Sequence, residues 1–131
     1  MRTTLIKSLT LDNPKLYVTV NGERRLFAEC TAAIEVYENR QTIAMLGAHN
    51  GVKKTYYAKL ICSDMDYMRD FDDDYLRSVS YFLMSSEVQR KDGVFEKLNI
   101  DNISLLEFEP DDDWVFELQL TTEFRAKIMN Y

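Results

Sequence analysis

Residues 15–37 read KLYVTVNGERRLFAECTAAIEVY, and this stretch indicates an antiparallel β fold. Aliphatic side chains occupy every second position from Leu16 to Val20, which is the period of a strand with one buried face. Asn21-Gly22 follows and is the strongest short signal for a hairpin turn, because a type I′ turn needs positive φ at both central residues. The chain then returns as a long strand from Arg24 to Tyr37. The buried face of this strand is expected to carry Cys30, Ala32, Ile34 and Val36.

The alternation of a strand continues through the rest of the chain. After a turn at Glu38–Arg40, the segments that carry it are residues 41–46, 55–62, 78–89, 94–100, 102–108 and 114–120. The polar stretch 47–54 is bounded by glycine and predicts a loop. Turn signals recur about every 10 residues, which is the spacing of a sandwich or barrel.

One segment breaks the alternation. Within residues 64–76, Tyr67, Phe71 and Tyr75 recur at helical spacing, which predicts a short helix. We therefore expect a mainly β protein, an antiparallel β-sandwich or barrel of six to eight strands with one short helix near residues 64–76. Residues 1–131 are expected to form a single β-sandwich domain.

Composition restricts the class of protein. The chain has 16 basic and 22 acidic residues, a formal net charge of −6, which argues against a nucleic-acid binder that works by neutralising phosphates. No apolar run approaches the roughly 20 residues that a membrane span needs. Residues 1–7 lack the apolar core of a signal peptide. We expect a cytoplasmic or virion protein, not secreted by a signal peptide and without a membrane partner.

Candidate residues for catalysis and metal binding are few. The one histidine, His49, stands in the glycine-bounded stretch, and no Ser lies in a GxSxG motif. Asp70, Asp72 and Asp74 open a calcium-loop pattern that fails at its sixth position, Tyr75, and at its twelfth, Tyr81. Phosphate-binding glycine loops do not occur in the sequence. No catalytic, cofactor-binding or metal-binding residue is therefore assigned, no cofactor is expected, and we interpret the protein as not an enzyme.

The two cysteines, Cys30 and Cys62, do not form a CxxC pair. Because both lie in apolar alternating segments, we interpret them as buried, reduced thiols. A disulfide between them would require their strands to be neighbours.

The acidic excess is concentrated in two segments. Residues 64–74 hold six Asp and one Arg, and residues 111–113 hold three more Asp. The remaining chain has 13 acidic and 15 basic residues. Such clusters solubilise a fold, repel polyanions or meet a basic partner.

The order of these elements resembles the tail tube proteins of long-tailed phages. The residues that carry the resemblance are Leu26–Glu35, Glu38–Gln41, Ile43–Gly47, the Lys53-Lys54 pair, Tyr56-Tyr57, Val94–Asp101 and Trp114–Leu120. The resemblance covers residues 24–122. The family places an amphipathic helix between its sheets, whereas residues 64–76 are short and Asp-rich here.

The resemblance implies a β-sandwich that self-associates into hexameric rings, which stack into a tube through which DNA passes. An acidic lumen would let DNA slide without specific binding, and residues 47–54 would contact the next ring. Three alternatives remain open. They are a small-molecule or peptide-binding β-barrel module, an enzyme that uses acidic residues alone or with a metal, and another phage or secretion-machine part such as a tail terminator.

Overall fold

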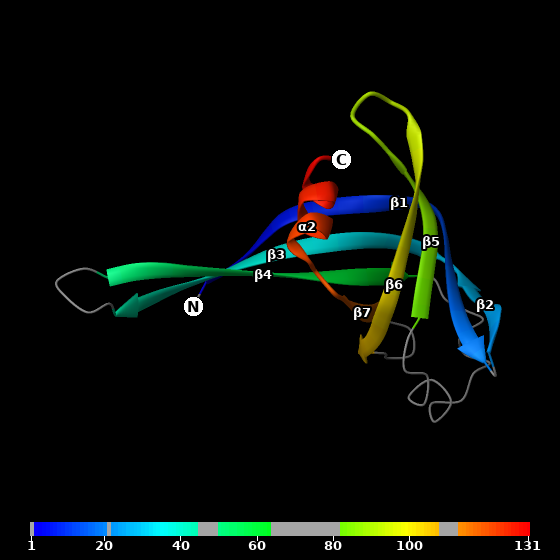
Figure 1. The fold of residues 1–131 in the computed structure, drawn as a ribbon, viewed down its shortest axis with the longest axis horizontal. Helices are drawn as coiled ribbons and strands as arrows, with labels where there is room; N and C mark the ends of the chain where they lie inside the picture. The colour runs from blue at the N-terminus through cyan, green and yellow to red at the C-terminus, as the bar shows by residue number, and fades with distance from the viewer. Residues whose placement is uncertain (1, 21, 45–49, 64–81, 108–112) are drawn as a thin grey trace.

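A computed structural model describes residues 2–20, 22–44, 50–63, 82–107 and 113–131 (Figure 1). These residues form seven antiparallel strands and one short helix, so the expected mainly β fold is confirmed. The elements are β1 (Arg2–Val20), β2 (Glu23–Glu29), β3 (Thr31–Ala44), β4 (Asn50–Ser63), β5 (Phe82–Gln89), β6 (Phe95–Glu107), β7 (Trp114–Leu118) and α2 (Thr122–Met129).

The strands pair in the order β2-β1-β3-β4-β7-β6-β5, and β5 pairs again with β1. The pairing therefore closes a barrel-like ring through β1, β3, β4, β7, β6 and β5, with β2 attached to β1. Two strands of this ring, β1 and β6, change their pairing partners along their length. The first part of β1 pairs with β3, and its last part pairs with β2 and β5. Likewise, β6 pairs first with β5 and then with β7.

Both of these strands bend at an asparagine with positive φ. Asn13 has φ 50° and is followed by Pro14, which has no amide hydrogen to give to a ladder. Asn102 has φ 55° and lies where the partner of β6 changes from β5 to β7. Asn tolerates this backbone region better than other residues with a Cβ atom. The two bends turn a flat sheet into a closed one.

Aromatic side chains fill the middle of the ring. Phe82 makes edge contacts with Phe27 at 5.4 Å and with Phe116 at 5.3 Å between ring centroids. Trp114 meets Phe27 at 6.5 Å. Aliphatic residues from β1, β3, β4 and β6 complete a single hydrophobic core. The alternation in β3, β4 and β7 supplies this core one residue in two, as the sequence pattern predicted.

Several predicted boundaries are wrong. The strand predicted over residues 24–37 is broken at Cys30 into β2 and β3, and the expected turn at Glu38–Arg40 lies within β3. Residues 50–54 of the predicted loop belong to β4. These residues extend beyond the core and contain only one apolar side chain, Val52, so they resemble a loop in sequence. The predicted helix near residues 64–76 lies outside the described residues.

The helix α2 was not predicted. Its N-cap is Thr121, whose Oγ1 accepts a hydrogen bond from the Phe124 amide at 3.1 Å. Glu123 in the first turn and Lys127 in the last match the helix dipole. Ile128 is its one buried residue and packs into the core. The helix therefore covers part of the ring through Ile128 and through the partly buried Phe124, which packs against the same core.

Candidate functional site

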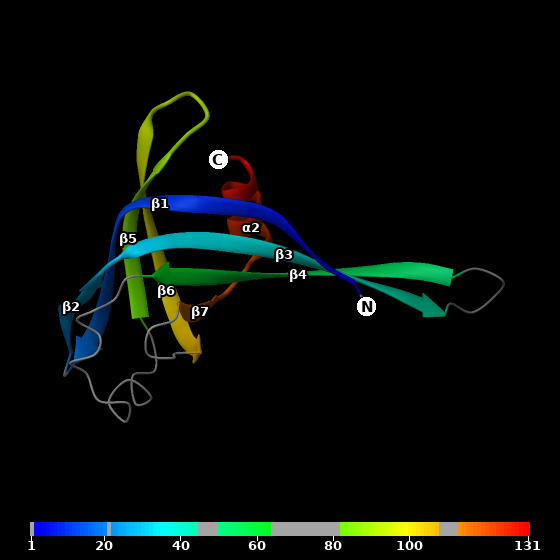
Figure 2. The same ribbon diagram turned by 180° about the vertical axis from the view of Figure 1, so that it is seen from behind.

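The most distinctive feature of the structure is a long hairpin formed by β3 and β4, which projects away from the ring (Figures 1 and 2). Its register runs without a break from the Thr31–Ser63 pair to the Ala44–Asn50 pair. β1 accompanies β3 only as far as Arg40, and β7 accompanies β4 only over residues 58–62. We call the outermost part, residues 41–44 and 50–54, the arm.

The arm has no core of its own. The side chains of residues 41–44 and 52–54 are exposed, including two apolar ones: Ile43 is 37% exposed and Val52 is 61% exposed. Val52 lies opposite Thr42 and Ile43 lies opposite Gly51, so the two apolar side chains are on opposite faces. A two-stranded ribbon in water is at best marginally stable by itself. Apolar surface on both faces of the arm suits contact with another protein.

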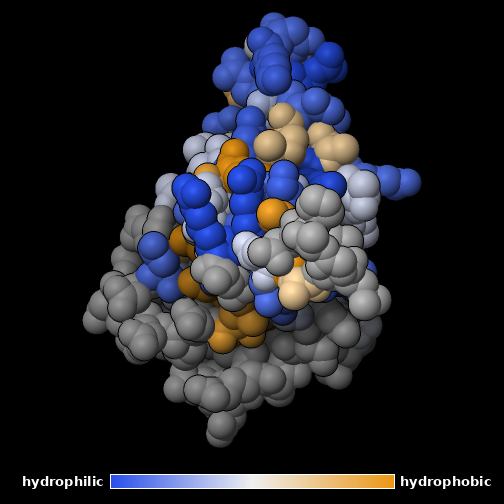
Figure 3. Space-filling model, turned by 90° about the vertical axis from the view of Figure 1, so that its left-hand side faces the viewer, coloured by the Kyte–Doolittle hydropathy of each residue, from blue (hydrophilic) through white to orange (hydrophobic). Residues whose placement is uncertain are grey.

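The arm is also basic. Residues 39–55 contain Arg40, Lys53 and Lys54 but no Asp or Glu. Outside this segment the chain has 13 basic and 22 acidic residues. The projecting hairpin is therefore opposite in charge to the chain as a whole. Figure 3, which looks at the end of the molecule from which the hairpin projects, shows a mostly hydrophilic surface with small, separate apolar areas.

At the root of the arm, the core face of β3 changes from apolar to charged. Glu38 continues the face of Ile34 and Val36 and is only 8% exposed. Its carboxylate forms an ion pair with Arg40. The hydrogen bond from Arg40 lowers the pKa of Glu38, and a further hydrogen bond from Tyr56 adds to this effect. Because a buried charge needs a partner, Glu38 orders the side chains where the arm begins.

Aromatic contacts stiffen the same region. Arg125 of α2 lies 3.9 Å from the Tyr56 ring centroid, a cation–π contact that joins the helix to β4. On the outer face, Tyr37 and Tyr57 stack across the strands with centroids 5.1 Å apart. Tyr37 donates a hydrogen bond to Glu35, which is the main cause that raises the pKa of Tyr37 to about 12. These contacts hold in place the side chains of β3 and β4 from which the arm extends.

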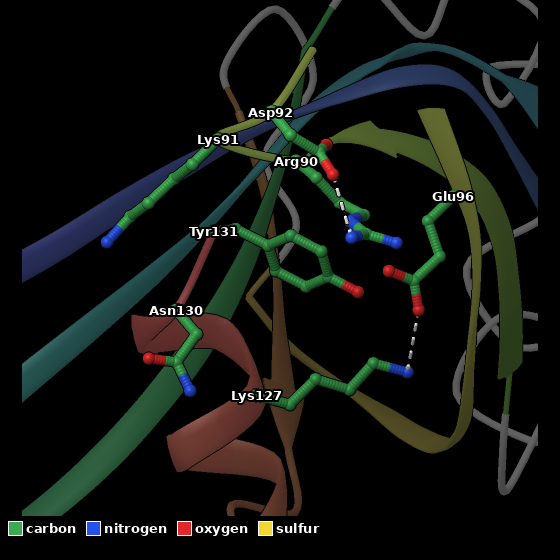
Figure 4. Close-up of a pocket in the computed structure, with 7 residues that line it drawn as sticks. All are labelled: Arg90, Lys91, Asp92, Glu96, Lys127, Asn130 and Tyr131. Carbon is green, nitrogen blue, oxygen red and sulfur yellow. Dashed lines mark hydrogen bonds and ion pairs between the residues drawn. The ribbon is translucent and has the colours of Figure 1, made fainter. Parts of the chain in front are cut away.

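A second feature is a cavity of about 380 Å³ between the β5–β6 turn and the end of α2 (Figure 4). Arg90 pairs with Asp92 at 2.8 Å, and Lys127 pairs with Glu96 at 3.8 Å. The Tyr131 hydroxyl is buried beside Glu96. Burial raises the pKa of Tyr131, and the nearby Glu96 charge adds to it. The carboxylates of Asp92 and Glu96 are each paired with a cation, an arrangement that is typical of structural ion pairs rather than of an acid–base site.

The sequence candidates for chemistry fall mostly outside the described residues. His49, Asp70, Asp72, Asp74 and the two tyrosines of the calcium-loop pattern lie there, as do residues 47–48 of the predicted ring-contact loop and residues 111–112. Asp113 is described and exposed. Among the described residues, no group of three or more His, Cys, Asp or Glu could hold a metal ion. Cys30 and Cys62 are brought together, as discussed below.

Sequence reasoning missed both the arm and its buried root. A usable signal was the strand period itself, which continues from Val36 through Glu38 and Arg40 in polar residues. Comparison with protein-family models, curated proteins and solved structures found no match. In the part of the chain that the structure describes, no helix is long and apolar enough to cross a membrane.

Proposed function

We propose that the protein is a structural assembly subunit whose copies associate through the arm into rings, as the resemblance to phage tail tube proteins implies. The arm is the observation that carries this proposal. It extends beyond the core, exposes Ile43 and Val52 on opposite faces, and is basic in an otherwise acidic chain. Such a ribbon gains stability when a neighbour covers it, and its charge suits the acidic surface of a second copy.

The charge distribution supports the tube form of this proposal. The Asp-rich segments 64–74 and 111–113 hold nine of the 22 acidic residues. In a ring, an acidic lumen repels the phosphates of DNA, so that DNA passes in transient contact without specific binding. The subunit would work in the virion, or in the cytoplasm before assembly, without a cofactor and without catalysis. A tail terminator or another phage or secretion-machine part would use the arm in the same way.

The cavity beside α2 favours a second candidate, a small-molecule or peptide-binding module. Its volume of about 380 Å³ falls within the range of small-ligand sites. It lies outside the ring, however, and both of its carboxylates, Asp92 and Glu96, are already paired with cations. Assembly is therefore the function that the described geometry supports best.

The oligomeric state tests the proposal directly. We expect size-exclusion chromatography with light scattering to give a mass that is a multiple of 15.4 kDa, and negative-stain microscopy of the same fractions to show rings or tubes. Val52→Asp places a charge on the arm contact and is expected to lower the assembled fraction about tenfold or more. Because Val52 is exposed, folding should change by no more than about 0.5 kcal/mol.

Val94→Asp is the matched control. Val94 is 55% exposed, as an apolar residue beside the β5–β6 turn and away from the arm. It undergoes the same change of side chain and of net charge. Equal assembly of the two variants, or a 15.4 kDa monomer of the wild type at every concentration, would contradict the proposed role of the arm.

A further inference from the structure

The fold brings the two cysteines together from distant parts of the chain. Cys30 lies at the corner between β2 and β3, and Cys62 lies near the end of β4. β3 and β4 are paired neighbours, and Cys62 of β4 lies opposite Ala32 of β3. Ala32 comes two residues after Cys30 in the chain. Cys30 therefore occupies a diagonal position on the face that carries Cys62, and it packs against the core to which Cys62 belongs. The two thiols are free and hydrogen-bonded to each other.

The two thiols differ in access. Cys62 is fully buried, whereas Cys30 is half-buried at the edge of the core. The hydrogen bond that Cys62 donates lowers the pKa of Cys30, although burial acts in the opposite direction. The same contact, together with burial, raises the pKa of Cys62. A half-buried thiol with a lowered pKa beside a second, buried thiol is the arrangement of a redox-sensitive pair.

We propose that Cys30 is a site of oxidation by hydroperoxides and that Cys62 is its resolving thiol, so that the product is a disulfide within one chain. In the first step the Cys30 thiolate attacks the peroxide. A sulfur–oxygen bond forms, the oxygen–oxygen bond breaks, and the leaving oxygen takes a proton to become an alcohol or water. The sulfur loses two electrons, which reduce the peroxide.

In the second step the Cys62 sulfur attacks the sulfenic acid on Cys30. The sulfur–sulfur bond forms, the sulfur–oxygen bond breaks, and the departing hydroxide leaves as water with the Cys62 proton. The bridge closes a loop that contains the whole β3–β4 hairpin, including the arm. A cross-link of this kind restricts the unfolded chain, so the oxidised protein should melt at a higher temperature.

The reaction can be followed on the reduced full-length chain with hydrogen peroxide as the oxidant. We expect the native protein to lose both titratable thiols and two hydrogen atoms of mass, and peptide mapping to join Cys30 to Cys62. Dilute protein keeps the bridge within one chain. The reaction is independent of whether copies assemble, because neither cysteine belongs to the arm.

Two variants assign the roles. In Cys62→Ser, the sulfenic acid on Cys30 should persist and be trapped by dimedone. In Cys30→Ser, the buried Cys62 should stay unmodified under the same treatment. Where the serine at position 62 prevents folding, Cys62→Ala provides the same test. Retention of both thiols by the native wild type would overturn the proposal, as would a bridge found only between chains or dimedone labelling of Cys62 in place of Cys30.

Discussion

Phe116 is fully buried at the centre of the ring and meets Phe82 edge to face. Truncation to Ala removes most of a ring from a filled core and leaves a cavity that its neighbours only partly close. We expect Phe116→Ala to lower the free energy of unfolding by about 3–5 kcal/mol, as measured by urea denaturation.

Phe95→Ala is the matched control for this substitution. Phe95 is 55% exposed in β6, so the same change of side chain removes little buried surface. Its cost should stay within about 0.5 kcal/mol. Similar losses from the two variants would contradict the assignment of Phe116 to the core.

Single residues of the core were predictable because period-two alternation decides which face a side chain occupies. It placed Ala32, Ile34 and Val36 on the buried face, and the structure confirms this. Glu38 was not predictable in this way. Its parity puts it on the same face, yet its charge suggested a turn. Its burial depends on Arg40 and Tyr56, of which Tyr56 comes from the paired strand.

At the scale of elements, α2 depends on its N-cap as well as on its apolar contacts with the core. Ile128 is its one buried residue, and the helix spans only Thr122–Met129, which is too short to be stable alone. We expect Thr121→Ala to lower the free energy of unfolding by about 1 kcal/mol, because it leaves the Phe124 amide without its acceptor.

Thr122→Ala tests whether the cap itself is responsible. Thr122 is also an exposed threonine, so the side-chain change is identical. It lies inside the helix, however, where Ala has a higher helix propensity than Thr. Its substitution should leave stability unchanged within about 0.5 kcal/mol. Equal losses at the two positions in thermal melts would show that the Thr121 side chain does not cap α2.

Elements whose partners lie far away in the chain were the ones that sequence could not predict. α2 contributes only Phe124 and Ile128 to the core, and it is also held by Arg125 against Tyr56 and by Lys127 against Glu96. Two apolar residues four positions apart are too short a pattern to identify a helix, and the polar partners Tyr56 and Glu96 lie far away in the chain. The arm was not predicted for a related reason. Beyond the core a strand no longer needs an apolar face, and residues 50–54 therefore have the composition of a loop.

At the scale of the whole molecule, closure of the ring rests on two bends. Asn13 and Asn102 allow β1 and β6 to belong to both sides of the sheet. The sequence contains both residues but does not state which strands meet across each bend, because pairing is decided by packing of the common core. The class of fold was therefore predictable, whereas the strand order was not.

The whole-molecule charge distribution leads to the last prediction. The segment that contains the arm is basic, and the rest of the chain is strongly acidic. Assembly driven by the arm should be steered by attraction between opposite charges, which salt screens. We expect the association rate in light scattering to fall about tenfold between roughly 0.05 and 0.5 M NaCl.

Charge reversal separates attraction at the arm from the effect of net charge. The double variant Lys53→Glu, Lys54→Glu makes the arm acidic and should abolish both assembly and its salt dependence. The control, Lys91→Glu with Lys97→Glu, changes the net charge equally at exposed positions of the β5–β6 hairpin. If the two double variants behave alike, overall repulsion governs assembly. If only the arm variant fails, the arm must meet an acidic surface of its neighbour, because no other difference in charge separates the two proteins.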